Sequence, residues 1–488
     1  MSTTRETILH CLSVHDPARE AIRWGDQIWT IGELTSNATQ WAVTLKEYIQ
    51  PGEIVVCDYQ EDPFEYMALF LGVMAAGGIH LSTRDRNSTW NRLNRIGASW
   101  NAVSRIAPQP HEIAALDGLR LVLAPDAQVL LVQTPSKGST SDSAEPGRIL
   151  ETSGSTGEPK WVYWTEQDLL ADRRSWIEEL ALTTADKVLN LHPLDFAHGI
   201  DVHVLPALMI GALLIHRNIR IDNKAEIAAD LTVHGITMMS ALPSHYTSIA
   251  VCCTAPNAGQ SVRMALVGGA LLSPASVQMV YRRTGLQLKR LYGATEAGIM
   301  CADLKRDEQS LPRLRPMSGV SMTIRPLSNV ISAVFPTVGE PYFRRTHMAR
   351  SYWGDPERTA SAFSDGWYKS GDAVICNDDG SVAVLGRVDD VWINPDSEVM
   401  HSSGEVSASL VDVEGVTEVA VIPPKGEALS LATVFCTVDP NAHLKKVEAE
   451  IASILSAAGV RANIYLSNEW PRTLVGKPDR RALLAWVQ

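Results

Sequence analysis

Apolar and polar residues alternate along this chain in blocks that predict strands and helices in succession. Residues Glu53 to Asp58 form a short apolar run typical of a buried strand, and Pro63 to Ala76 has the apolar periodicity of a helix, which a Gly-Gly pair then ends. Upstream, Thr30 and Glu33 have the spacing of a capping box at the start of an earlier helix. The pattern therefore predicts a layered α/β fold.

The alternation continues through the middle of the chain and changes in character near the C-terminus. After Leu385 to Asp390 (LGRVDD), the strands and helices become those of a small α+β module. We predict a large N-terminal α/β domain over residues 1–386 and a small C-terminal α+β domain over residues 391–488. The predicted elements include strands at Lys187–Leu191, Gly235–Ser240, Met264–Val267, Val416–Ile422 and Leu431–Val438, and helices at Leu169–Leu180 and Leu444–Ala457.

Composition and charge narrow the class of protein. The 488 residues are 45% hydrophobic and 20% charged, as in a soluble globular protein of two or three domains. A formal net charge of −12 disfavours nucleic acid and anionic membrane as main partners. The seven cysteines are scattered without a CxxC pair and indicate neither a disulfide framework nor a zinc site. Because no apolar run is long enough to span a bilayer, we expect a cytoplasmic protein.

The most distinctive stretch runs from Ile149 to Val162 and reads ILETSGSTGEPKWV. Gly154 and Gly157 permit backbone conformations that turn N–H groups towards an anion, and Lys160 adds positive charge. Hydroxyl donors come from Ser153, Ser155 and Thr156. The spacing differs from that of the common P-loop, which disfavours kinases and GTPases of that class. A polyphosphate is the expected ligand, and a flexible surface loop is the alternative interpretation.

Two further segments place polar groups or glycines after a predicted strand. Aromatic, imidazole and carboxylate groups gather at His192 to Gly199, before an apolar helix that is expected to end at Ile210. Ligands are usually met at such strand ends in α/β proteins, although a single histidine such as His198 is more often structural. Gly268 and Gly269 also follow a strand, where they allow the close approach of a flat ring or form a plain tight turn.

Two carboxylates and one lysine complete the candidate chemistry. Glu296 lies on a turn with Tyr292 and Thr295, where it can hold Mg²⁺ against phosphate oxygens, and a solvated surface carboxylate is the alternative. Asp372 ends the segment GWYKSGD and can bind a ribose diol or belong to an ordinary Asp turn. Lys477 lies on a glycine-containing turn near the C-terminus and is either a site residue or part of a basic tail.

Together and in this order, the segments resemble the adenylate-forming superfamily, which contains acyl- and aryl-CoA synthetases, adenylation domains of nonribosomal peptide synthesis, and luciferases. The matching stretches, which span nearly the whole chain, are GDQIWTIGEL, MAAGGIHL, TSGSTGEPK, LYGATEAG, GWYKSGD, GRVDD and PRTLVGKPDRRAL. The resemblance implies a large N-terminal α/β domain and a small mobile C-terminal domain, which swings about a hinge at residues 387–390 between two half-reactions.

The resemblance also implies roles for the matching residues. Thr152 to Lys160 would grip the pyrophosphate end of ATP, Glu296 would bind Mg²⁺, and Lys477 would reach into the site from the small domain. The implied nucleotide-binding residues are Thr152, Ser153, Gly154, Ser155, Thr156, Gly157, Gly268, Gly269, Ala270, Tyr292, Gly293, Asp372 and Arg387. The implied catalytic residues are Lys477, Thr295, Glu296 and Lys160, with Glu296 and Thr156 at the metal, Asp389 at the hinge, and Phe196, His198 and Gly268 at the substrate pocket.

The chain departs from the family pattern at three places. Trp161 stands where a glycine usually follows the lysine of the phosphate loop, and Glu166 stands where a histidine is common. After the hinge, Pro395 and Asp396 replace small residues in the segment implied for thioester formation, and proline restricts the conformations of that segment. The resemblance therefore supports the first half-reaction better than the second.

The leading hypothesis is a ligase that uses ATP and Mg²⁺ to activate an aryl or acyl carboxylic acid as its acyl-AMP. The acyl group then passes to a thiol, either CoA or the phosphopantetheine arm of a carrier protein. One alternative is a freestanding amino-acid adenylation enzyme, for which Asp195 and Asp201 lie near the expected ammonium-binding position but out of register. A nucleotide-binding protein without turnover is another. The sequence does not identify the acid, the thiol acceptor or the oligomeric state. It also does not decide whether the 392–399 segment supports thioester formation.

Overall fold

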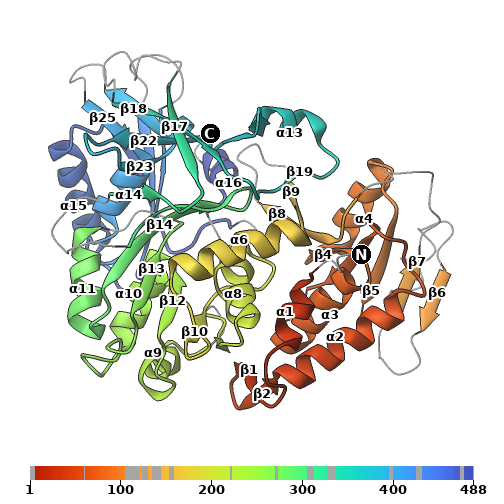
Figure 1. Ribbon diagram of the computed structural model, residues 1–488. Helices are drawn as coiled ribbons and strands as arrows, with labels where there is room; N and C mark the ends of the chain where they lie inside the picture. Colours follow the sequence, from red (N-terminus) through yellow and green to blue (C-terminus); the bar gives the residue numbers. More distant parts are fainter. Residues whose placement is uncertain are drawn as a thin grey trace.

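The computed structural model describes residues 6–59, 61–104, 120–123, 130–133, 144–152, 159–219, 222–269, 273–304, 313–327, 337–394, 399–424, 431–472 and 478–486. Strands and helices alternate along most of the chain (Figure 1), which confirms the predicted α/β fold class. Within these residues no helix is both long and apolar enough to cross a bilayer.

Among the described residues, the largest sheet has nine strands in the order β16-β15-β14-β13-β12-β10-β11-β1-β2. The strands from β1 to β14 in this order are parallel, and β2, β15 and β16 join antiparallel. The carboxyl ends of the parallel strands therefore meet at one edge. The strands are β1 Glu20–Trp24, β2 Gln27–Thr30, β10 Lys187–Asn190, β11 Leu213–His216, β12 Met238–Ala241, β13 Met264–Val267, β14 Leu288–Ala294, β15 Gly298–Asp303 and β16 Arg315–Pro316.

Helices cover both faces of this sheet, as buried parallel strands require. Helices α9, α10 and α11 share one core with it, which contains Tyr246 and Val280. Helices α3, α6 and α8 share another core that joins this sheet to the second large sheet, and Met67 and Leu170 lie there. The helices of this part are α1 Ile8–Ser13, α2 Ile31–Leu45, α3 Pro63–Ala75, α4 Arg86–Arg95, α6 Glu166–Glu179, α7 Ala197–Gly199, η1 Ile200–Val204, α8 Leu205–Met209, α9 Lys224–Val233, α10 Pro243–Cys252, α11 Pro274–Thr284 and α13 Pro356–Ala362.

Two more sheets complete the part of the chain before the predicted hinge. One has the order β19-β9-β8-β4-β3-β5-β7-β6 and the other the order β20-β21-β18-β22-β23, with β17 paired to β18. Strands of the first are β3 Ile54–Asp58, β4 Ile79–Thr83, β5 Trp100–Ser104, β6 Arg120–Leu123, β7 Leu130–Gln133, β8 Gly147–Thr152, β9 Lys160–Thr165 and β19 Ser351–Tyr352. Strands of the second are β17 Ser321–Pro326, β18 Val338–Arg344, β20 Phe363–Ser364, β21 Trp367–Lys369, β22 Asp372–Cys376 and β23 Val382–Arg387.

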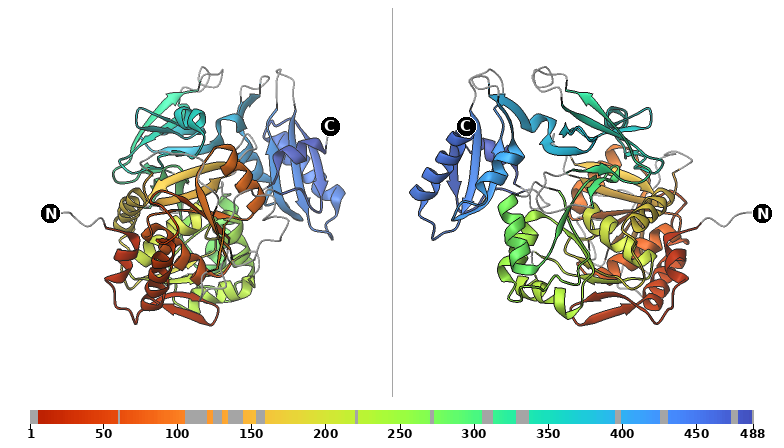
Figure 2. Two further views of the ribbon diagram at one scale, coloured as in Figure 1. Left: turned by 90° about the vertical axis from the view of Figure 1, so that its right-hand side faces the viewer. Right: turned by 60° about the vertical axis from the view of Figure 1, so that its left-hand side comes forward.

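The last part of the chain has its own sheet and core. A short 3₁₀ helix, η2 Val388–Asp390, leads into it, and Figure 2 shows the residues that follow, in blue, as a body beside the rest. Val434 and Ile451 lie in a core formed by this part alone. Its elements are β24 Val391–Asn394, β25 Val399–Ser402, α14 Ser403–Leu410, β26 Val416–Ile422, β27 Ala432–Val438, α15 Leu444–Ala457, β28 Ala462–Ser467 and α16 Arg480–Ala485.

Local sequence signals located several elements correctly. Thr30 caps α2 and forms the predicted capping box with Glu33. The strand Met264–Val267 and the helix Leu444–Ala457 have the predicted bounds. The single helix predicted to end at Ile210 is wrong, because α7, the π-helix η1 and α8 follow one another there. The contacts that impose this break come from other elements and are described below.

Candidate functional site

The candidate site lies where the parallel strands of the largest sheet end. Gly268 directly follows β13, Thr295 directly follows β14, and His192 lies two residues after β10. Strands β14, β13, β12 and β10 are neighbours in the sheet (Figure 1), so these residues share one edge. This is the edge at which open α/β sheets bind ligands. The prediction that Tyr292 lies on the turn with Thr295 is wrong, because Tyr292 belongs to β14.

Three residues join into a polar cluster beside this edge: Lys160, Tyr352 and Glu296. The Lys160 ammonium lies 3.3 Å from the Tyr352 hydroxyl and 4.8 Å from the centroid of its ring. The same hydroxyl donates a 2.7 Å hydrogen bond to the buried carboxylate of Glu296. Burial lowers the pKa of Lys160, while the charge of Glu296 opposes that shift. One tyrosine therefore connects the predicted phosphate-binding lysine with the predicted metal ligand.

Tyr352 is a member of this cluster that the sequence reasoning missed. It reaches the site because β19 pairs antiparallel with β9, which places Tyr352 opposite Val162. That pairing joins segments nearly two hundred positions apart, as the residue numbers show. No local motif signalled it, since a tyrosine beside a tryptophan also suits an ordinary core strand.

A second cluster joins Tyr292, Asp372 and Arg387. The Tyr292 hydroxyl lies 2.5 Å from Asp372 Oδ2, and Arg387 Nη1 lies 3.1 Å from Asp372 Oδ1. Burial raises the pKa of Asp372, and Arg387 opposes that change. Gly371 has a φ of +70°, and a Cβ there would lie 2.3 Å from the Arg387 guanidinium. A glycine is therefore needed directly before β22 begins.

The two clusters face a common aromatic layer. Tyr292 contacts Phe343 with ring centroids 5.8 Å apart, and Phe363 lies 5.8 Å from Tyr352 and 5.4 Å from Tyr368. The charge of Arg387 also bears on Lys160, so the clusters lie within electrostatic range. Basic groups, carboxylates and aromatic rings thus surround one end of the sheet.

The structure brings together only part of the implied nucleotide site. Thr152 ends β8 directly opposite Lys160, Gly269 has a φ of +79°, and Gly293 and Asp389 are exposed. The residues on which the remaining predictions fall lie outside the described ranges; they are Ser153, Gly154, Ser155, Thr156, Gly157, Ala270, Pro395, Asp396 and Lys477.

The departures from the family pattern in β9 and directly after it have structural roles. Trp161 is buried, its indole N–H donates to Glu151 at 3.0 Å, and the Arg92 guanidinium lies 3.9 Å from its ring centroid. Glu166 is also buried and accepts a 2.9 Å hydrogen bond from the backbone N–H of Ile8, at the start of α1. Both replacements therefore serve packing rather than the site.

A buried chain of charges supports the Thr295–Glu296 turn. Asp201 binds Arg148 and, at 3.3 Å, Arg173; Arg173 binds Asp172, which also binds Arg345. Every one of these side chains is at most 8% exposed. The guanidinium of Arg345 donates to the carbonyls of residues 297 and 299 at 3.1 and 3.2 Å, just beyond the turn. Asp201 directly follows the predicted substrate segment around Phe196 and His198. The buried charges therefore fix that segment relative to the Thr295–Glu296 turn.

Trp164 holds the same turn from β9. Its indole N–H donates a 2.7 Å hydrogen bond to the carbonyl of Thr295, and its ring lies within 6.0 Å of the Arg148 and Arg173 guanidinium groups. Gly298 has a φ of +66°, and a Cβ there would lie 2.9 Å from an Asp172 oxygen. The glycine of the ATEAG segment is therefore needed for close approach to the charge chain.

No ready-made metal site is found among the described residues, and a cavity lies away from the candidate site. Within the described part of the chain, no group of three or more His, Cys, Asp or Glu side chains is arranged to hold a metal ion. A single carboxylate is nevertheless compatible with Mg²⁺, which usually takes one or two carboxylates together with phosphate oxygens and water.

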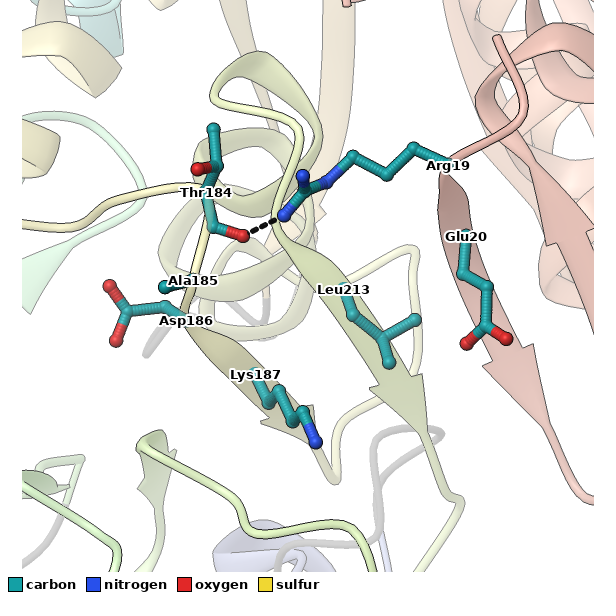
Figure 3. Close-up of a pocket in the computed structure, with 7 residues that line it drawn as sticks. All are labelled: Arg19, Glu20, Thr184, Ala185, Asp186, Lys187 and Leu213. Atoms are coloured by element: carbon teal, nitrogen blue, oxygen red, sulfur yellow. Dashed lines mark hydrogen bonds between the residues drawn. The ribbon is translucent and has the colours of Figure 1, made fainter. Parts of the chain in front are cut away.

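Figure 3 shows a cavity at the opposite edge of the sheet, where Arg19 donates to the carbonyl of Thr184 beside the start of β10. It lies away from the residues discussed above.

The chain belongs to the AMP-binding enzyme family, whose model matches residues 13–353. This confirms the resemblance to the adenylate-forming superfamily. The chain is 25% identical over 508 residues to tyrocidine synthase 3 of Brevibacillus parabrevis, covering 98% of this chain but 8% of that protein. It is 26% identical over 470 residues to a feruloyl-CoA synthase of Amycolatopsis sp., covering 94% of both chains. The chain thus spans a small part of tyrocidine synthase and nearly all of the CoA synthase.

Solved structures share the fold over nearly the whole chain. An anthranilate CoA ligase in complex with anthranoyl-AMP is similar with a TM-score of 0.79 and 19% identity, covering 99% of this chain and 97% of that one. An O-succinylbenzoate coenzyme A synthetase of Bacillus subtilis in complex with AMP gives a TM-score of 0.78 at 18% identity, with 98% coverage of both chains.

Replacing Tyr352 with phenylalanine tests the link between Lys160 and Glu296. The ring beside Lys160 is retained, but the hydroxyl contacts are lost. Since a hydrogen bond to a charged group contributes about 1.5 kcal/mol, we expect about a 10-fold weaker apparent affinity for MgATP in a kinetic titration. Tyr163→Phe is the matched control, because its hydroxyl donates to the carbonyl of Glu145 instead. Equal effects of the two substitutions would contradict the assignment.

Proposed function

We propose that this chain is an ATP-dependent acid–thiol ligase that activates an aryl or acyl carboxylic acid as its acyl-AMP. The observation that carries the proposal is the pairing of two clusters at one sheet edge: Lys160 with Glu296 through Tyr352, and Asp372 with Arg387. The first suits a polyphosphate with its cation, and the second suits the diol of a ribose. The likeness to CoA synthases over nearly the full chain supports the same reading.

In the proposed first half-reaction, a carboxylate oxygen of the acid forms a bond to the α-phosphorus of ATP. The bond between that phosphorus and the bridging oxygen breaks, and pyrophosphate leaves. Both reactants are anions, so catalysis depends on charge neutralisation and in-line positioning. Lys160 neutralises the departing phosphates, and Thr295 binds the α-phosphate. Glu296 would hold Mg²⁺, which would supply further charge neutralisation.

In the proposed second half-reaction, the sulfur of a thiol loses its proton to solvent and forms a bond to the acyl carbon. The bond between that carbon and the bridging oxygen breaks, and AMP leaves with this oxygen. The acceptor is CoA or a carrier-protein phosphopantetheine; the CoA synthases and the nonribosomal peptide synthases among the relatives correspond to these two choices. We assign domain boundaries of 1–386 and 391–488 to the two bodies, with residues 387–390 as the hinge. Across these bodies, Asp412 contacts Ser273 at 2.6 Å and Ser276 at 3.2 Å.

The charge chain favours an uncharged acid tail over an amino acid. An amino-acid substrate needs a carboxylate for its ammonium group, and the two candidates already have cationic partners. Asp195 binds Arg84 through two hydrogen bonds, of 2.7 and 3.0 Å. Asp201 binds Arg148 and Arg173 in the interior.

Acid-dependent exchange of pyrophosphate into ATP tests the proposal. Across a panel of aryl, fatty and amino acids, we expect exchange with aryl or acyl acids and none with amino acids. Subsequent addition of CoA or of a phosphopantetheinylated carrier protein identifies the acceptor by thioester formation. No exchange with any acid, in a protein that still binds ATP by calorimetry, would favour a nucleotide-binding role without turnover.

A further inference from the structure

The buried charge chain that supports the Thr295–Glu296 turn carries more positive than negative charge. Among the described residues it joins three guanidinium groups to only two carboxylates, those of Arg148, Arg173, Arg345, Asp201 and Asp172. The pKa of Arg173 is lowered to about 10 by burial, which Asp201 opposes and the charges of Arg148 and Arg345 reinforce. An ion in the interior without full compensation is costly, so this chain calls for one further negative charge.

Arg148 is the end of the charge chain at which donors are left over. One of its nitrogens, Nη2, donates to Asp201. Within the part of the chain that the structure describes, its Nε and Nη1 have no hydrogen-bond partner, although the residue is fully buried. A guanidinium group has five N–H donors, accepts no hydrogen bond and keeps its charge in proteins. A negatively charged acceptor would satisfy the donors and the charge together.

A second buried donor lies beside Arg148. Strands β4 and β8 are parallel and place His80 directly opposite Arg148, so the two side chains lie on the same face of the sheet. Among the described residues Nδ1 of His80 has no hydrogen-bond partner, and His80 is 1% exposed. Burial lowers the pKa of His80 to about 3, and the charge of Arg148 adds to that shift. The ring is therefore neutral at pH 7 and can carry its proton on Nδ1.

Aromatic rings enclose His80 and Arg148. The rings of Tyr66 and Phe70, from α3, lie 5.5 and 5.0 Å from that of His80 in edge-on arrangements. On the other side, β9 sets Trp164 opposite Arg148, with its ring centroid 6.0 Å from the guanidinium carbon. Burial raises the pKa of Tyr66 well above its ordinary value, so its hydroxyl is also neutral. All three aromatic residues are at most 2% exposed, which closes the site to bulky ligands.

The chemistry of this enclosure favours a monatomic anion. Water satisfies buried donors, but it is neutral and leaves the surplus positive charge in place. A carboxylic acid or a phosphate is too large for a space closed by rings. A halide ion is small, carries the single negative charge that the charge chain calls for, and accepts hydrogen bonds from any direction.

We propose that Arg148 and His80 bind a chloride ion in the interior, on the face of β4 and β8 that α3 covers. The ion completes the charge chain at the end opposite Arg345, whose guanidinium donates to the carbonyls beyond the Thr295–Glu296 turn. It is a structural ligand, and the inference does not depend on the proposed ligase activity.

Unfolding in urea, followed by tryptophan fluorescence, tests the proposal. Potassium chloride is exchanged for potassium gluconate at constant ionic strength, because gluconate is too large for the site. An ion that binds only the folded state lowers the equilibrium constant of unfolding in proportion to its concentration once the site is saturated. We therefore expect a rise in chloride of about 10-fold to lower that constant about 10-fold. Equal constants in chloride and gluconate would overturn the inference.

Substitutions locate the ion. Arg148→Met removes the surplus charge and the donors together, so it should abolish the chloride dependence. His80→Phe keeps a ring beside Tyr66 without the nitrogen, and should shift the dependence to about 10-fold higher chloride, as expected for loss of one hydrogen bond to a charged group. Arg84→Met is the matched control, because Arg84 is also bound to an aspartate but is 35% exposed, and it should retain the wild-type dependence.

Bromide provides a measurement that does not require a variant to fold. Anomalous diffraction from crystals of the unaltered protein grown in bromide should place an ion within hydrogen-bond distance of the Arg148 guanidinium. Anomalous peaks at the surface alone would overturn the inference. A chloride dependence that stays unchanged in both Arg148→Met and His80→Phe would do the same, because the stabilising ion would then bind elsewhere.

Discussion

Replacing Asp201 with alanine is expected to lower the free energy of unfolding of the large α/β part by about 3–5 kcal/mol. The reason is that Asp201 is the only carboxylate bonded to Arg148 among the described residues, and it also pairs with Arg173. Both guanidinium groups are at most 2% exposed. Without Asp201, two positive charges stay in the interior with less compensation, and water cannot reach them. Urea titration followed by tryptophan fluorescence provides the measurement.

A matched control comes from the same segment. Asp195→Ala removes a carboxylate whose arginine partner, Arg84, is 35% exposed, and exposed pairs contribute about 0–1 kcal/mol. A double substitution, Arg148→Met with Asp201→Leu, replaces one buried pair by apolar groups and should recover part of the lost stability. If Asp201→Ala lowers the free energy of unfolding by no more than Asp195→Ala does, the buried charges around Asp201 do not stabilise the interior as described.

The fold was predictable wherever the signal lies within a few neighbouring residues. The capping box of Thr30 and Glu33 is one such signal, and the apolar run of β13 is another, because a cap and a buried strand each impose their own residue types. The break in the helix after Gly199 was not predictable in this way. Its π-helix is bonded to β8 through Asp201 and to β12 through His203, and these contacts are remote in sequence.

The residues of the candidate site likewise fall into two groups: those that a local motif indicates and those that only the folded structure reveals. Asp372, Arg387, Lys160 and Glu296 are found from motifs, and the structure places them in two neighbouring clusters. Tyr352 and Arg345 carry no motif of their own; strand pairing and a buried ion pair bring them to the site. Ser240 is a similar case, since only the fold brings this serine of β12 into contact with His192, His198 and His203, which lie in three other segments.

Replacing Lys477 with alanine is expected to slow acid-dependent pyrophosphate exchange by about 10²-fold or more. In the proposed first half-reaction, its ammonium group bridges the attacking carboxylate and the α-phosphate as negative charge builds between them. A contact made mainly in the transition state lowers kcat more than it raises KM, so the loss should fall on kcat. Steady-state exchange measured over a range of acid and ATP concentrations separates the effect on kcat from the effect on KM.

The control for Lys477 is another lysine in the same part of the chain. Lys446 lies on α15, is 65% exposed and pairs with Glu414 at 2.8 Å, so Lys446→Ala should leave exchange close to the wild-type rate. A second comparison bypasses the first half-reaction. When acyl-adenylate is supplied, attack at phosphorus is no longer needed, and Lys477→Ala should form thioester with a much smaller defect. Near-normal exchange in Lys477→Ala would remove Lys477 from the first half-reaction, whereas equal loss in both assays would point to a general defect of the C-terminal part rather than to chemistry at the α-phosphate.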